Sequence, residues 1–318
     1  KRKMTGKLEE DMKRLEEKLC DIVKKENVIL NKDMSKEVSF KVGGMADAFV
    51  VPENLNELCN IIKLLREEDI EYFVMGNGPN FIITDKGYHG VIVKISPKYF
   101  GEIKMIKFDD ECEIEVEAGI LMSTLSRELV KESVAGFEFA SGIPGTIGGA
   151  VFMNAGAYGG EMQDIVQSVK VIDERGDTKV ISASEMEFSY RNSRLQRTKE
   201  IVISVKMLLK RGNREEIKRK IAQLTKKRNE KQPVNFPSAG SFFKRPAGYY
   251  AGTLIQEAGL KGMTVGRAQV SELHGGFIIN LGGATATDIL KLRDICKDEV
   301  MKKFGVKLET EIRILGDE

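Results

Sequence analysis

The sequence is poor in several residues on which active sites often depend. Its 318 residues include no tryptophan, only two histidines and four cysteines. This inventory argues against a His-ligated metal centre and against a Ser/His/Asp triad, so we expect no bound metal. The cysteines have no paired spacing, and we expect them to be reduced and mostly buried in a cytoplasmic protein. They are Cys20, Cys59, Cys112 and Cys296.

The sequence also lacks a long apolar run and a strong net charge. No stretch approaches the roughly 20 apolar residues needed to cross a bilayer. The 50 basic and 48 acidic residues leave a formal charge of +2, and no clustered basic face is available for nucleic acid. We therefore expect a cytoplasmic protein that binds a small molecule, with no nucleic acid, no membrane and no obligate protein partner.

Periodicity predicts a mixture of helices and strands. Apolar residues at helical spacing predict an amphipathic helix over residues 8–25, formed by Leu8, Met12, Leu15, Leu19 and Ile22. Further helices are predicted at 54–66, 122–131, 213–229, 249–258 and 285–304. Strands are predicted at 48–51, 72–75, 90–95, 166–173, 179–181, 201–209 and 308–315, with a hairpin over 102–118. The fold class is α+β, with helices on the faces of mixed sheets, and the length is sufficient for two or three domains.

A first glycine-rich segment directly follows the strand predicted at 72–75. Paired glycines allow backbone N–H groups to approach a phosphate and form an anion-binding concavity. A tight turn between two strands would have the same composition, so the segment alone does not decide between them. Its residues are Gly76, Asn77, Gly78, Pro79 and Asn80.

A second glycine-rich region begins at Ser141, and seven glycines lie between positions 142 and 160. Pro144 is typical of a helix start, where free N–H groups favour an anion. Two such segments indicate a bound diphosphate, which both a flavin dinucleotide and a nucleotide sugar contain. The candidate contacts are Ser141, Gly142, Ile143, Pro144, Gly145, Thr146, Gly148, Gly149 and Ala150.

Three polar clusters complete the set of candidate site residues. Ser241 lies between a glycine and two phenylalanines, where a hydroxyl can deliver a proton without a histidine; an ordinary hydroxyl in a turn is the alternative. Arg191 lies in Tyr-Arg-Asn-Ser. On the strand predicted at 308–315, alternation places Glu309, Glu311 and Arg313 on one face, which could also be a solvated surface.

The ordered set of motifs resembles the UDP-N-acetylenolpyruvoylglucosamine reductases from about residue 30 to the C-terminus. The motifs are Ser-Gly-Ile-Pro-Gly-Thr-Ile-Gly-Gly-Ala, Met-Asn-Ala-Gly-Ala-Tyr-Gly-Gly-Glu, Tyr-Arg-Asn-Ser, Gly-Ser-Phe-Phe-Lys and Leu-Glu-Thr-Glu-Ile-Arg-Ile. The resemblance implies a two-part FAD-binding unit of vanillyl-alcohol-oxidase type and a C-terminal α+β substrate domain. The expected segments are an N-terminal helix (1–29), two FAD-binding subdomains (30–97 and 98–212) and a substrate-binding domain (213–318).

The resemblance also implies a reaction. NADPH would reduce FAD, and the flavin would reduce the enolpyruvyl ether of UDP-N-acetylglucosamine to UDP-N-acetylmuramate. This step belongs to peptidoglycan synthesis and cell-wall biogenesis, and so to cell shape, cell division and the cell cycle. Arg191 and Glu311 would stabilise the enolate-like intermediate, and Ser241 would donate the proton. The substrate contacts would be Tyr190, Lys244, Arg245, Arg228 and Gln256.

Two departures within the motifs matter. The family usually has Ser where Pro79 stands, so one hydroxyl contact to the flavin diphosphate is not expected here. Arg245, together with the absence of an inserted tyrosine loop, indicates the shorter, second type of the family.

An FAD-dependent sugar or alcohol oxidase of the same fold is the main alternative, although many of these tether the flavin through a His or Cys that residues 76–80 lack. A non-catalytic nucleotide-sugar sensor would be expected to lose one of Ser241, Arg191 or Glu311.

Overall fold

The computed structural model describes residues 6–317, and the side chains from residue 10 onward. The chain forms two compact units, each assembled from several stretches, whereas the sequence predicts four consecutive segments. Unit 1 comprises the residues up to Asn31, Asp47–Asn77 and Gly90–Thr225, and unit 2 comprises Lys32–Ala46, Gly78–His89 and Lys226 onward. The consecutive segments remain a proposal about the functional domains.

In unit 1, helices α1 (Gly6–Cys20) and α2 (Leu55–Glu67) share one apolar core through their buried leucines and isoleucines. Asn54 begins α2 because its side chain accepts a hydrogen bond from the Glu57 N–H at 3.0 Å. The prediction that the first helix reaches residue 25 is wrong. The chain turns after Cys20 so that Val23 enters the core, and the apolar spacing therefore continues past the helix end. The side chain of Leu8 lies outside the described side chains.

The strands that flank α2 along the chain form a four-stranded sheet in the order β1 (Val28–Asp33), β2 (Met45–Val50), β5 (Tyr88–Lys94), β3 (Tyr72–Met75). Strands β3 and β5 run parallel, with Tyr72 opposite Val91. Helix α2 connects β2 to β3, so the predicted alternation of strand and helix over residues 48–95 is confirmed.

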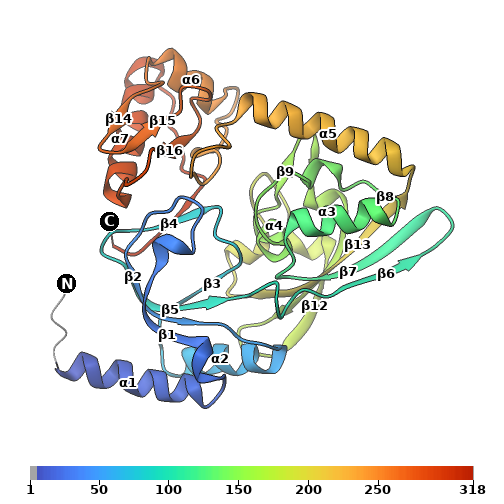
Figure 1. Cartoon of the computed structure of the whole chain (residues 1–318), viewed down its shortest axis with the longest axis vertical. Coiled ribbons are helices and arrows are strands. Elements are labelled where there is room, and N and C mark those ends of the chain that lie inside the picture. Colours follow the sequence, from blue (N-terminus) through green and yellow to red (C-terminus); the bar gives the residue numbers. More distant parts are fainter. Residues whose placement is uncertain (1–5, 318) are drawn as a thin grey trace. The chain divides into compact units, whose positions relative to one another are not determined.

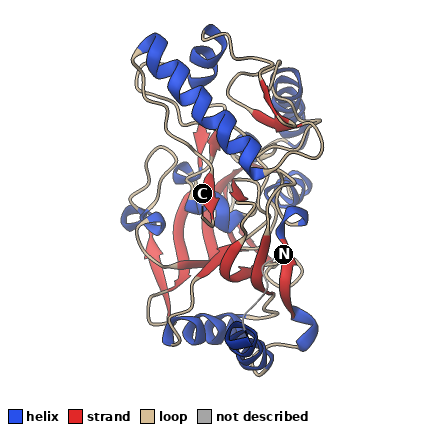
Figure 2. Cartoon of the chain, turned by 90° about the vertical axis from the view of Figure 1, so that its left-hand side faces the viewer, coloured by secondary structure: helices blue, strands red, loops and turns tan. Residues whose placement is uncertain are grey.

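The largest sheet of unit 1 is antiparallel, and Figure 2 shows strands in red lying side by side. Its order is β12 (Thr178–Ser182), β11 (Val166–Ile172), β13 (Ile201–Arg211), β7 (Glu111–Glu117), β6 (Ile103–Lys107), with β8 (Val134–Ala135) paired to β13. Helix α4 (Ile147–Phe152) packs against β13 and β7, and α3 (Met122–Lys131) contacts β8. The predicted hairpin over 102–118 is confirmed as β6 and β7. A two-stranded ribbon, β9 (Gly156–Ala157) with β10 (Gly160–Glu161), carries part of the second glycine-rich region.

Unit 2 is built around two helices, α6 (Ala251–Glu257) and α7 (Ala286–Phe304), with a small sheet of β14 (Thr264–Val265), β15 (Ala268–Val270) and β16 (Ile278–Asn280) (Figure 1). Helix α5 (Arg214–Lys231) leads into this unit along the chain. Strand β4 (Phe81–Ile83) pairs in parallel with β17 (Arg313–Leu315). Short 3₁₀ turns occur in both units, at Lys25–Asn27, Met34–Lys36, Glu138–Ala140, Met162–Asp164, Ala183–Met186 and Arg194–Gln196.

The prediction of a continuous final strand over 308–315 is wrong, since only Arg313–Leu315 forms one. Before it, a single bridge pairs Thr310 with Phe243. Leu308 and Ile312 are both buried, and their spacing of four residues places them on one face, as the predicted alternation requires. The predicted alternation is therefore kept without a continuous strand, with Glu309 and Arg313 exposed and Glu311 half-buried.

Candidate active site

The two glycine-rich segments meet within unit 1. Gly76 directly follows β3, and a Cβ atom built on it would lie 2.3 Å from Thr146 Oγ1 and 2.9 Å from Thr146 Cγ2. Thr146 is only 3% exposed, and its hydroxyl accepts a hydrogen bond from the Gly149 N–H at 3.4 Å. Only glycine fits at position 76 without a shift of Thr146, so two residues 70 positions apart in the sequence are in close contact here.

The predicted helix start after Pro144 is confirmed, because α4 begins at Ile147. The expectation that its first N–H groups are free for an anion is wrong. The Ile147 N–H donates to the Ile120 carbonyl and the Gly148 N–H donates to the Ala118 carbonyl, both at 2.9 Å. A Cβ on Gly148 would lie 2.9 Å from the Ala118 Cβ. Gly148 therefore allows α4 to pack closely on the chain that follows β7.

Residues on either side of these contacts have defined conformations. Ser141 donates its hydroxyl proton to the Glu138 carbonyl at 2.9 Å, and Gly145 has a φ of +123°. Gly76 and Asn77 belong to unit 1, whereas Gly78, Pro79 and Asn80 belong to unit 2. In unit 2, the Gly78 carbonyl accepts from Ser39, the Asn80 carbonyl accepts from Arg313, and Gly78 has a φ of +68°. The left-handed φ values at Gly78 and Gly145 favour glycine at both positions.

Arg191 lies in a tight turn of unit 1. Ser189 and Asn192 exchange two backbone hydrogen bonds of 3.1 Å around it, and Arg191 has a φ of +53°. Its Nη2 atom donates to the Gly156 carbonyl at 3.1 Å, and the guanidinium carbon lies 5.0 Å from the centroid of the Tyr190 ring. A non-glycine residue in the left-handed region is uncommon and is held there by its surroundings.

Two residues near this turn were not among the predicted site residues. Ser193 is buried, and its hydroxyl donates to the Phe152 carbonyl at 2.8 Å. Asn154 is also buried, and its side-chain amide donates to the Ser189 carbonyl at 3.0 Å. The two bonds join residues 189–193 to the end of α4 and to the segment that follows it. In the sequence, the only indication of these contacts is that Asn154 and Ser193 are polar residues within the motifs.

Ser241 and Glu311 lie on neighbouring segments of unit 2. The Glu311 N–H donates to the Phe242 carbonyl at 2.9 Å, on one side of the Ser241 segment. On its other side, the Phe242 N–H donates to Gly276 at 2.8 Å, and Ser241 forms a bridge with Phe277. Ser241 is exposed, whereas the Phe242 side chain is fully buried. Two of the three predicted catalytic residues are thus placed by one backbone arrangement, and Arg191 belongs to the other unit.

Lys244 and Arg245 follow the same segment of unit 2. Lys244 forms an ion pair with Glu309, with Nζ and Oε2 3.7 Å apart. The Arg245 guanidinium stacks over the Tyr250 ring, with its carbon 4.0 Å from the ring centroid. The Lys244 side chain is 40% exposed and Arg245 is exposed, so an anion can approach both.

The two remaining predicted substrate contacts lie on helices. Gln256 is exposed on α6, and its Oε1 atom accepts from Lys261 at 3.5 Å. Arg228 is half-buried in the last turn of α5. Both belong to unit 2.

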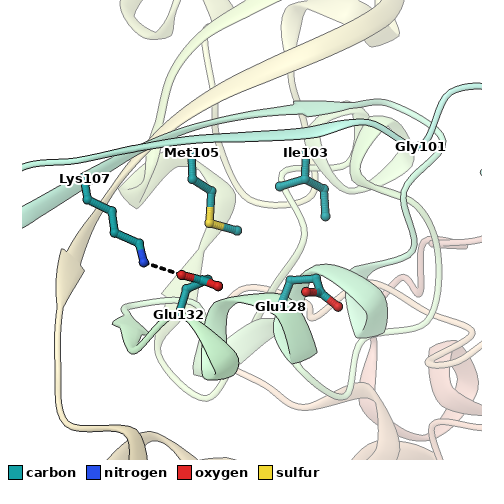
Figure 3. Close-up of a pocket in the computed structure, with 6 residues that line it drawn as sticks. All are labelled: Gly101, Ile103, Met105, Lys107, Glu128 and Glu132. Atoms are coloured by element: carbon teal, nitrogen blue, oxygen red, sulfur yellow. Dashed lines mark hydrogen bonds and ion pairs between the residues drawn. The ribbon is translucent and has the colours of Figure 1, made fainter.

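An open depression of about 650 Å³ lies elsewhere, between β6 and α3 of unit 1. Figure 3 shows the side chains of Ile103 and Met105 pointing from β6 toward α3, with Lys107 paired to Glu132 across it. None of the predicted catalytic, cofactor or substrate residues lines this depression.

Other expectations concern thiols, metals and membranes. All four cysteines are free, Cys112 and Cys296 are buried, and burial raises the pKa of the Cys296 thiol to about 12. Cys20 and Cys59 are half-buried. Within the described part of the chain, no three His, Cys, Asp or Glu residues gather in a way that could hold a metal ion. No helix among residues 6–317 has the length and apolar character to span a membrane.

Two family descriptions match the chain. Residues 46–182 match an FAD binding domain, and residues 232–315 match the C-terminal domain of UDP-N-acetylenolpyruvoylglucosamine reductase. The first match contains the Gly76–Thr146 contact, and the second contains Ser241 and Glu311. The division between an FAD-binding part and a C-terminal domain, expected from the motifs, is therefore confirmed.

Full-length relatives agree with these matches. The UDP-N-acetylenolpyruvoylglucosamine reductase of Alkaliphilus oremlandii is 47% identical over 300 residues, covering 94% of this chain and 97% of the relative. That of Caldanaerobacter subterraneus subsp. tengcongensis is 48% identical over 303 residues, covering 95% and 98%. The crystal structure of the Thermus caldophilus reductase matches with a TM-score of 0.76 at 35% identity, covering 91% of this chain and 98% of that one. The chain therefore belongs to the UDP-N-acetylenolpyruvoylglucosamine reductase family.

Proposed function

We propose that the protein catalyses NADPH-dependent, FAD-mediated reduction of the enolpyruvyl ether of UDP-N-acetylglucosamine to UDP-N-acetylmuramate. The observation that carries this proposal is identity of 47–48% to named reductases over 94–95% of the chain. Because the similarity includes the C-terminal domain as well as the FAD-binding part, it favours the reductase over an oxidase that shares only the flavin fold.

The residues of unit 1 fit a bound FAD. The close approach of Gly76 to Thr146 brings the two glycine-rich segments together, and glycine-rich backbone allows N–H groups to approach a phosphate. We assign FAD to the segments Gly76–Asn80 and Ser141–Ala150, within the proposed subdomains 30–97 and 98–212. When bound, FAD takes a hydride from NADPH and supplies it to the substrate.

Arg191 has the role of stabilising negative charge on the substrate. Addition of a hydride to an enol ether conjugated to a carboxylate leaves an enolate-like charge that needs cationic or hydrogen-bonding partners. The Gly156 carbonyl and the Tyr190 ring orient the Arg191 guanidinium before any substrate binds. Because folding already fixes the orientation of the guanidinium, Arg191 loses less conformational freedom when the charge develops on the substrate.

Ser241 has the role of proton donor to the substrate carbon, with Glu311 as a second stabilising group. The exposed Ser241 lies between two hydrogen-bonded segments, which fix its backbone on both sides. A serine hydroxyl is a weak acid, and it can protonate an enolate because that carbon is more basic still. The hydrogen bond from the Glu311 N–H to the carbonyl of Phe242, the residue after Ser241, supports this assignment.

The cationic residues of the C-terminal segment 213–318 would bind the substrate diphosphate. Arg245 and Lys244 are accessible, and a guanidinium can bind a phosphate through two parallel hydrogen bonds. Arg228, Gln256 and Tyr190 complete the proposed substrate contacts. With Arg245 after Lys244, the chain has the pattern of the shorter, second type of the family.

The proposed reaction has consequences for the cell. In this proposal the enzyme acts in the cytoplasm on a small molecule, without a membrane, nucleic acid or obligate protein partner. Through peptidoglycan synthesis it would contribute to cell shape, cell division and the cell cycle.

The test separates the two half-reactions under anaerobic conditions. NADPH should bleach the flavin absorbance, and UDP-N-acetylglucosamine enolpyruvate should restore it. Ser241→Ala should leave bleaching unchanged and slow the recovery roughly 10²- to 10⁴-fold, the usual contribution of a positioned acid. Ser238→Ala, in the same loop, is the matched control and should leave both rates unchanged.

Two outcomes would contradict the proposal in different ways. Bleaching without recovery would mean that the enolpyruvyl ether is not the electron acceptor. An equal loss of both half-reactions in Ser241→Ala would mean that Ser241 supports the structure and does not donate the proton.

A further inference from the structure

In unit 1, the side-chain amide of Asn154 has a hydrogen-bond partner for each of its two donors and for its acceptor. It is 0% exposed, and its Nδ2 atom donates to the Ser189 carbonyl and to Glu161 Oε2, both at 3.0 Å. Its Oδ1 atom accepts from the Gln163 N–H at 2.9 Å. A buried polar group with partners for both of its donors and its acceptor is costly to replace, because each partner would be left unsatisfied.

The bonds of Asn154 hold the two segments that the Arg191–Gly156 hydrogen bond joins, namely the turn that carries Arg191 and the ribbon that contains Gly156. One donor of Asn154 reaches Ser189, which starts the turn that carries Arg191. The other reaches Glu161, which pairs across the β9–β10 ribbon with Gly156, the residue whose carbonyl accepts from Arg191. One side chain therefore fixes the distance between the turn and the ribbon.

The chemistry of this position requires a neutral donor. The two acceptors facing Nδ2 are a carbonyl oxygen and a carboxylate oxygen. An aspartate there would place a second carboxylate against both and would lose both donors. The backbone of Asn154 has a φ of +43°, a conformation that Asn and Gly tolerate better than other residues.

We infer that Asn154 is a positioning residue for Arg191 in the reduction of the enolpyruvyl substrate. This inference rests on the proposed function, in which Arg191 stabilises charge on the substrate. Asn154 itself touches no substrate and acts by holding the turn and the ribbon in register. Its loss should slow the step that needs Arg191 and spare the step in which NADPH reduces the flavin.

The experiment uses Asn154→Gly in the FAD-loaded protein, since glycine removes the amide and keeps the left-handed backbone. Asn31→Gly is the matched control, because Asn31 is an exposed asparagine with a φ of +50° outside the site. In Asn154→Gly, recovery of the flavin absorbance by the enolpyruvyl substrate should slow about 10- to 100-fold, the effect of a misplacement near 1 Å. Bleaching by NADPH should stay within about twofold of the wild-type rate. Asn31→Gly should leave both rates unchanged.

A double-mutant cycle with Arg191→Ala distinguishes positioning from a general structural role. If Asn154 acts through Arg191, Asn154→Gly should slow recovery less than about twofold further when Arg191 is already alanine. Losses that multiply would overturn the inference, as would an equal slowing of bleaching and recovery. If Asn154→Gly does not retain FAD, the same cycle with Asn154→Ser, which keeps one donor, distinguishes positioning from a structural role by the same two results.

The cycle also separates this inference from the proposed function. If Arg191→Ala alone keeps the wild-type rate of recovery, the role assigned to Arg191 fails, and the inference fails with it. If Arg191→Ala slows recovery and Asn154→Gly does not, the proposed function stands and only the inference about Asn154 is overturned.

Discussion

Replacement of Gly76 by alanine tests whether the two glycine-rich segments form one surface. The added Cβ would lie 2.3 Å from Thr146 Oγ1, 2.9 Å from Cγ2 and 3.2 Å from Cβ. Gly76 is not among the glycines with positive φ, so the backbone accepts alanine and the whole effect comes from the contact. Thr146 is 3% exposed and has little space in which to move.

The magnitude follows from that overlap. Forcing a methyl group into a packed site costs about 1–3 kcal/mol, and we expect Gly76→Ala to lower the free energy of unfolding by that amount. Thr146→Ala alone should cost about 1 kcal/mol, because it removes the hydroxyl that caps α4. The double variant removes Oγ1 and Cγ2 and leaves only the 3.2 Å contact. It should be about 1–2 kcal/mol more stable than the sum of the two single effects predicts.

Urea unfolding measures the stabilities, and visible absorbance of the purified protein measures the FAD content. Gly76→Ala should lose FAD, and Gly76→Ala/Thr146→Ala should regain part of it. Gly149→Ala is the stability control, since its Cβ would meet Thr146 Oγ1 at an ordinary 3.6 Å. Additive effects of the two substitutions would refute the contact between the two segments.

Two further predictions concern unit 2. Asp85 accepts from the Ala286 and Thr287 N–H groups at 2.9 and 2.8 Å, so Asp85→Ala should lower the free energy of unfolding by about 1–2 kcal/mol, and Asp85→Asn by less, in urea unfolding; equal effects would contradict a role for the carboxylate. His274 accepts from the Gly276 N–H at 3.0 Å as a neutral imidazole, and burial lowers its pKa below the ordinary 6.5. As the pH falls, His274 is therefore protonated at a higher pH in the unfolded chain than in the folded chain. The free energy of unfolding should fall as the pH drops below 6.5. His274→Asn, which keeps an acceptor, should reduce this dependence between about pH 7.5 and about pH 5.5, and an unchanged dependence would assign it to other groups.

Elements set by local periodicity could be predicted from the sequence. The strand at Tyr72–Met75 and the helix at Met122–Lys131 have the predicted bounds, since their apolar spacing and their buried faces coincide. The predicted end of α1 was wrong because Val23 belongs to the core after a turn, which periodicity does not distinguish from another helical turn. The strand predicted over 308–315 was wrong over residues 308–312, because their pairing with residues 242–244 is set by tertiary contacts.

The candidate site was predictable as residue types and only partly as geometry. Ser241 and Glu311 lie on adjacent segments of unit 2, although 70 residues separate them, and only the ordered motifs connected them. The donors expected to be free at the start of α4 are bonded to Ala118 and Ile120, a pairing that no local pattern reports. Asn154 was missed because its partners Glu161 and Ser189 lie 7 and 35 residues away.

Backbone conformation gives a separate reason to regard the segment between α4 and β13 as functional. Of the eight described non-glycine residues with positive φ, four lie between positions 154 and 191: Asn154, Tyr158, Glu187 and Arg191. Each such conformation costs on the order of 1 kcal/mol or more and persists only where surrounding contacts hold it. A segment with only a structural role would not need so many, because other turns could connect the same strands at lower cost. The bonds from Asn154 and Ser193 offset this cost, and the conformation that they maintain is the one that orients Arg191.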